Sequence, residues 1–166
     1  SASYAMLSFK SAYLRRHFPA EFMAAVMSNH GGFYSTLAYA SEARRMGLEL
    51  LPPDVNRSAA RCRGKDKAIR FGLEMIKALS GAFVDRLIAE RTRGSSFASL
   101  DDFARRLRPG RAEAEALVGS GAVDSLAGGL PRPAQLMQLF AYSSALEAEA
   151  RCGPDSAELF DSLPSA

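Results

Sequence analysis

The sequence has little of what metal sites, disulfides or membrane spans require. Its two cysteines, Cys62 and Cys152, lie far apart, and neither belongs to a Cys-x-x-Cys pair, so we expect reduced thiols without a redox or metal-binding role. Its two histidines, His17 and His30, have no second ligand at metal spacing, which favours ordinary helix-end or surface positions. The sequence therefore predicts no metal site.

Long apolar runs are also missing. No segment approaches the roughly 18 consecutive apolar residues that a membrane helix needs, and no cationic leader precedes a short apolar segment. We therefore expect no membrane contact and a cytoplasmic location. With 48% hydrophobic and 23% charged residues in a chain of 166, the composition is that of a folded globular protein.

The net charge of +3 conceals a basic middle segment. Residues 56–93 carry ten basic and four acidic side chains, whereas residues 94–166 carry six and ten. A concentrated positive field favours polyanions such as nucleic acid. A basic stretch is also common on a merely solvated face, so charge alone leaves both interpretations open.

The spacing of apolar residues predicts a mainly α-helical protein with a small two-strand β element. Helices are expected over residues 2–17, 19–29 and 34–46, followed by short strands at 48–51 and 68–71. Between the strands, residues 54–67 are polar and basic, and we expect them to lie largely at the surface. A C-terminal helix is expected over residues 133–150, before a Gly153–Pro154 break and a tail.

Two helical hairpins are predicted between these parts. The first has a short helical stretch at 73–78, a turn at 79–81 and a helix at 83–93; Ser99 and Asp102 then form a capping-box pattern before a helix that ends near 107. The second has a helix at 111–119, a turn at 120–122 and a short segment at 123–126. The regions are thus 1–55, 56–130 with both hairpins, and 131–166.

A helix-hairpin-helix can bind DNA because the free N–H groups that begin its second helix suit a phosphate oxygen. Such contacts ignore base identity. The candidate DNA-binding residues, by backbone amide or cationic side chain, are Lys77, Leu79, Ser80, Gly81, Arg86 and Arg91 in the first hairpin and Ser120 and Gly121 in the second. The alternative is a plain antiparallel helix pair that packs only for stability.

Four segments carry a resemblance to one family. They are YLRRHFPAEFMAA at 13–25, RMGL with LPPDVN at 45–56, FGL with Ile76-Lys77 at 71–77, and LVGSGAVDSL at 117–126. In this order they resemble the alpha, or polymerase, subunit of bacterial DNA polymerase III, over roughly residues 1–150. The resemblance implies that residues 1–55 end the fingers region, and that 68–126 form a tandem helix-hairpin-helix region that holds duplex DNA.

The first hairpin departs from the family pattern. Where the family usually has Gly-x-Gly, this chain has Ala78-Leu79-Ser80, with Gly81 one place later. A positive φ at position 78 or 80 would cost about 1 kcal/mol without glycine. We therefore expect the first hairpin to bind phosphate more weakly than the corresponding hairpin of its relatives does.

The same resemblance implies that catalysis lies elsewhere. The family's catalytic aspartates, which would hold Mg²⁺, belong to a palm region upstream of Ser1, and the adjacent Asp101 and Asp102 are better explained by helix capping. We expect a segment of a longer polymerase that binds no cofactor and is inactive alone. The absence of clustered acids also disfavours a helix-hairpin-helix nuclease or glycosylase.

Partners follow from the resemblance as well. We expect duplex primer–template DNA, with other replisome subunits in the parent protein. The tail pair Leu159-Phe160 stands where the family has a peptide that docks on the sliding clamp, although the usual Gln is missing, and the pair could instead fold back on its own domain. The alternative function is a non-catalytic helical scaffold or replisome interaction module with little DNA contact.

Overall fold

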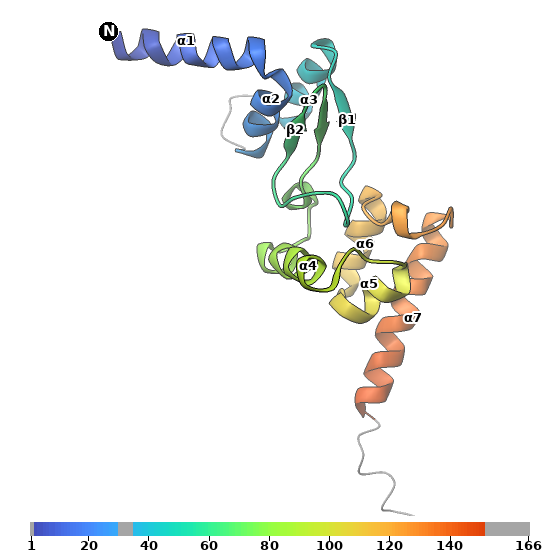
Figure 1. Cartoon of the computed structure of the whole chain (residues 1–166). Helices are drawn as coiled ribbons and strands as arrows, with labels where there is room; N and C mark the ends of the chain where they lie inside the picture. Colours follow the sequence, from blue (N-terminus) through green and yellow to red (C-terminus); the bar gives the residue numbers. More distant parts are fainter. Residues whose placement is uncertain (1, 30–34, 152–166) are drawn as a thin grey trace, which may run out of the picture.

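The computed structural model describes residues 2–29 and 35–151 and is mainly helical, as predicted (Figure 1). The elements are α1 (Ala2–His17), α2 (Pro19–Ser28), α3 (Thr36–Arg45), β1 (Glu49–Leu51), β2 (Arg63–Lys65), β3 (Ala68–Arg70), the 3-10 helix η1 (Leu73–Met75), α4 (Gly81–Gly94), α5 (Leu100–Leu107), α6 (Arg111–Ser120), the 3-10 helix η2 (Asp124–Leu126) and α7 (Arg132–Arg151). In this part of the chain, no helix is long and apolar enough to cross a membrane.

The first core joins α2 and α3 to a three-stranded sheet. The strand order is β1-β3-β2, with β1 parallel and β2 antiparallel to β3. Helix α2 lies against β2 and β3, and Met23 and Met27 are buried there with Ile69. A Cβ at Gly64 would collide with the backbone of Ala20, so only glycine lets the helix and the strand approach this closely.

The sheet corrects the predicted number of strands. Strands at 49–51 and 68–70 do pair, but the element has three strands rather than two, because residues 63–65 add an edge strand. That strand is Arg-Gly-Lys, which has no β propensity, and its place depends on the contact between Gly64 and α2. Residues 54–67 do lie largely at the surface, as predicted, although Val55, Ser58 and Cys62 are buried.

The second core is formed mainly by helices α4 to α7, which lie in the lower half of Figure 1. Helix α7 packs against α5 and α6, and its Leu139 is fully buried among Phe103, Leu107 and Leu117. The first hairpin begins with the 3-10 helix η1 instead of the expected helical stretch at 73–78. Because Cys62 and Ile69 belong to the first core, the two cores do not divide at residue 55.

A partly buried loop, residues 54–58, connects the two cores, with Val55 and Ser58 buried and Arg57 exposed. The amide of Asn56 donates to the Phe97 carbonyl at 2.9 Å and its Oδ1 accepts from the Phe97 N–H at 2.8 Å. From α4, Nη1 of Arg91 donates to the carbonyls of Val55 (2.8 Å) and Ser58 (2.9 Å). Arg91 thus supplies partners for carbonyls that have none in a strand or helix, while the side chain of Asn56 ties the loop to the backbone of Phe97.

Arg106 fastens the end of α4 to α5. Its guanidinium lies 3.2 Å from Glu90 Oε1 and 3.3 Å from Asp102 Oδ2, and it stacks 4.4 Å from the centre of the Phe97 ring. It also donates to the Glu90 carbonyl at 2.6 Å. Burial opposes ionisation of Asp102, but hydrogen bonds from the Ala98 amide, Arg105 and Arg106 outweigh it and lower the pKa of Asp102.

The turn before α4 contains a strained residue. Ala78 has φ +72°, a left-handed conformation in which the Cβ of an L residue is crowded, while Ser80 has an ordinary extended φ of −74°. The side chain of Ser80 caps α4 by accepting a hydrogen bond from the Phe83 N–H at 3.1 Å. The sequence analysis named positions 78 and 80 as candidates for a positive φ, and only Ala78 of these two has one.

We expect Arg106→Ala to lower the free energy of unfolding by about 3 kcal/mol, because it leaves two partly buried carboxylates without their partner. The matched control is Arg105→Ala, which removes one exposed ion pair with Asp102 and should cost about 0.5 kcal/mol or less. Urea denaturation measures both. Equal losses for the two variants would contradict this role.

We expect Ala78→Gly to raise the free energy of unfolding by about 0.5–1 kcal/mol, because glycine adopts the left-handed conformation without strain. The control Ala89→Gly, at an exposed position inside α4, should lower it by about 1 kcal/mol. Chemical denaturation of the two variants checks that their free energies of unfolding change in opposite directions. A destabilised Ala78→Gly protein would refute the assigned strain.

Candidate nucleic-acid interface

The first hairpin is held firmly against the loop that precedes β2. The amides of Leu73 and Glu74 donate to the carbonyls of Ala59 (2.9 Å) and Ala60 (3.0 Å). A Cβ at Gly72 would collide with the backbone of Ala60 and Arg61, so glycine is required for this approach. These contacts fix the position of the turn that follows, between η1 and α4.

The start of α4 offers open backbone donors. Its cap uses the amides of Phe83 and Val84, which bond to the side chain and the carbonyl of Ser80. Within the part of the chain that the structure describes, the amides of Ser80, Gly81 and Ala82 have no hydrogen-bond partner. All three residues are exposed, and the space beside Gly81 is empty. The partial positive charge of the helix end adds to these donors.

Leu79 does not have the free backbone amide that the sequence analysis predicted. Its amide donates to the Ile76 carbonyl at 3.3 Å, so it is not an open donor. Its side chain is partly buried against the second core. Leu79 therefore anchors the turn, while the neighbouring amides of Ser80 and Gly81 stay available.

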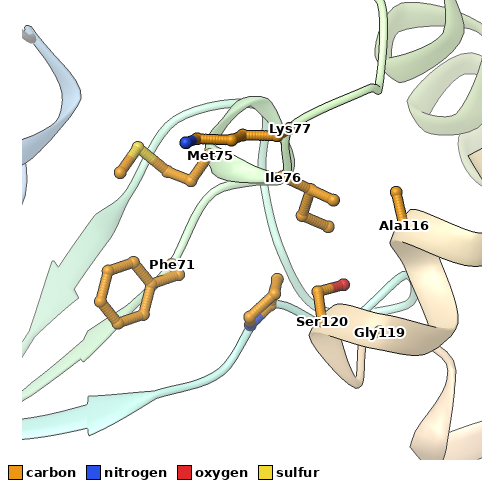
Figure 2. A pocket seen from close by; sticks show the side chains of 8 residues that line it. Phe71, Met75, Ile76, Lys77, Ala116, Gly119 and Ser120 are labelled. Carbon is orange, nitrogen blue, oxygen red and sulfur yellow. The ribbon is translucent and has the colours of Figure 1, made fainter.

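Lys77 lies on the rim of a hollow between the two hairpins. The hollow has a volume of about 460 Å³ and is mainly apolar, lined by Phe71, Met75 and Ile76 on one side and by Ala116, Gly119 and Ser120 on the other. Figure 2 shows the Lys77 side chain running away from α6. Lys77 is exposed, and its ammonium group has no partner among the described residues. The structure thus brings Lys77 and Ser120 to one hollow.

Arg86 and Arg91 both have structural partners. Arg86 donates to the Leu107 carbonyl at 3.0 Å, with its guanidinium 5.2 Å from the centre of the Phe83 ring. Arg91 holds the loop at 54–58, and burial lowers its pKa while the charge of Asp54 opposes that shift. Their spacing in the sequence did not reveal these roles. Contacts of either side chain with DNA stay predictions.

The second hairpin has no open amide at Gly121. This residue ends α6 with φ +77°, and its amide donates to the carbonyls of Leu117 and Val118. The hydroxyl of Ser120 donates to the Leu117 carbonyl at 3.0 Å. A Cβ at Gly121 would also press on the Asp124 carboxylate, so an acid sits at this turn. The amide donor expected from Gly121 is therefore used inside the protein.

The remaining predicted features are the carboxylates Asp101 and Asp102 and the clamp-binding peptide in the tail. Among residues 2–29 and 35–151, no three His, Cys, Asp or Glu side chains gather as a metal site would require. Asp101 accepts from Gln138 at 2.6 Å, and Asp102 accepts from the Ala98 amide at 3.2 Å. Leu159 and Phe160 lie outside the described residues.

Comparison with known proteins agrees with this geometry. Residues 47–133 match the model of a family described as a helix-hairpin-helix motif. The chain is 34% identical to DNA polymerase III subunit alpha of Thermus aquaticus over 92% of its own length and 13% of that protein. It is 39% identical to the same subunit of Neisseria meningitidis serogroup B and 39% identical to an error-prone DNA polymerase of Corynebacterium efficiens, in each case over 76% of this chain and 12% of the relative.

The chain therefore spans about an eighth of the length of the polymerases it matches. The matched share of this chain includes both hairpins and the sheet. On this evidence, the chain belongs to the family of bacterial DNA polymerase III alpha subunits.

Proposed function

We propose that this chain binds the backbone of duplex DNA without sequence preference, through the turn of its first hairpin. The observation that carries the proposal is the row of three unpartnered amides, those of Ser80, Gly81 and Ala82, at the start of α4. They would donate to one phosphate group, and Lys77 three residues earlier would add a charge-assisted contact. Such contacts position a duplex and carry no base information.

The proposal places the chain within a larger polymerase. Its relatives are named as DNA polymerase subunits, and we propose that in such a protein this part holds primer–template DNA while catalysis and Mg²⁺ binding belong to other regions. Docking of Leu159 and Phe160 on a sliding clamp, and contacts with other replisome subunits, stay predictions. The alternative is a helical scaffold with little DNA contact, which predicts no role for the open amides.

Gly81→Pro provides a sharp test, because proline removes one open amide and leaves the helix intact. Proline is favoured at the first position of a helix, and the preceding residue, Ser80, already has the extended conformation (φ −74°, ψ 151°) that proline requires. We expect affinity for a duplex to fall about tenfold, the value of one charge-assisted hydrogen bond. The salt dependence should stay the same, because no cation is lost.

The matched control is Gly81→Ala, which keeps the amide and places its Cβ in empty space. Fluorescence anisotropy with two duplexes of unrelated sequence would measure both variants. Affinities that are equal for the two duplexes, unchanged in Gly81→Ala and reduced in Gly81→Pro, support the proposal. Equal binding by both variants would leave the scaffold as the better account.

A further inference from the structure

We propose that the uncovered face of the sheet and the loop beside it form a second site for a nucleic-acid phosphate backbone, distinct from the hairpin. Two adjoining hollows, of about 510 and 480 Å³, share the residues Arg57, Ala59 and Arg63. Together they are lined by six cationic residues and one acidic residue, Asp66; the cations are Arg57, Arg61, Arg63, Lys65, Arg70 and Arg91. We call these hollows the sheet groove.

The strand register explains why the cations gather on this side. Helix α2 covers the face of the sheet that contains Gly64 and Ile69, and side chains alternate along a strand, so Arg63, Lys65 and Arg70 belong to the opposite face. Arg63 lies directly opposite Arg70 on the neighbouring strand. Like charges in opposite positions destabilise a sheet, and an anion bound between them would remove this cost.

Most of the charge in the groove is not neutralised. Within residues 2–29 and 35–151, the side chains of Arg57, Arg63 and Lys65 have no ion pair and no hydrogen bond. Arg61 is 3.9 Å from Glu74, an exposed pair, and Arg70 donates to the Pro52 carbonyl at 3.1 Å. The groove therefore holds several cations that are free to bind an anion with repeated negative charges.

The other lining residues favour a phosphate backbone over bases or a protein. Neither hollow is lined by an aromatic side chain, so there is no surface on which a base would stack. Small residues, Ala59, Ala60, Gly64 and Ala68, lie between the cations. Leu51 and Ile88 add one large aliphatic side chain to each hollow, which falls short of the cluster of large apolar anchors that a protein interface needs. The chemistry that fits is a row of phosphodiester groups, from a single strand or from a duplex.

Arg57→Ala/Arg63→Ala in the 166-residue chain tests the groove, with Arg45→Ala/Arg111→Ala as the matched control. The control removes the same charge from two exposed arginines outside the groove. Affinities for a fluorescent single-stranded DNA and for the corresponding duplex are measured at several salt concentrations. In the groove variant, we expect the slope of log K against log salt to fall by about 1.8 for the duplex or about 1.4 for the single strand.

The probe that shows this change identifies which form of DNA the groove binds. If the groove variant matches the control on both probes, the proposal is overturned. Should circular dichroism show that the groove variant is unfolded, Lys65→Ala replaces it, because that exposed side chain has no partner to lose; a slope reduced by about 0.9 on duplex supports the groove, and an unchanged slope on both probes overturns it.

The outcome is separable from that of the hairpin proposal. Gly81→Pro removes a neutral donor and is expected to change affinity without changing the salt slope, whereas the groove variant changes the slope itself. A groove variant that behaves like its control, beside a weakened Gly81→Pro protein, refutes the groove alone. The converse result refutes the hairpin alone.

Discussion

Hydrogen bonding of one partly buried loop, residues 54–58, is the constraint on which both proposed surfaces depend. The loop runs between a sheet-based core and a helical core, and side chains must supply the partners that its backbone cannot find in a strand or helix. Arg91 of α4 donates to two of the loop's carbonyls, and the side chain of Asn56 ties the loop to the backbone of Phe97. Because the same loop carries Arg57, it sets the position of the groove relative to the hairpin.

The two proposed surfaces would bind phosphate groups through different interactions, backbone amides at one and cationic side chains at the other. In the proposed site at the start of α4, neutral amides and the helix end would provide direction and hold a phosphate in one orientation. In the proposed sheet groove, exposed cationic side chains would provide charge and release counterions, which gives affinity without a fixed geometry. A protein that must hold DNA of any sequence needs both properties and needs no contact with base edges.

The sequence was sufficient for the parts that depend on local patterns. Apolar spacing and capping residues predicted the helices, and the cap at Ser99 follows from residue type alone. Tertiary contacts decided what the sequence missed. Strand β2 exists because α2 rests on Gly64, and Arg91 faces inward because a distant loop needs donors. The cations of the groove were visible as a basic segment, but only the strand register places them on one face.

The central claim is that the open amides at the start of α4 bind phosphate. The most direct measurement is a titration of ¹⁵N-labelled protein with a short duplex, followed by the chemical shifts of the backbone amides. The account predicts that the resonances of Ser80, Gly81 and Ala82 shift most and saturate together, while the amide of Leu79, bonded to Ile76, moves less. Binding of the duplex with these three resonances unchanged would contradict it.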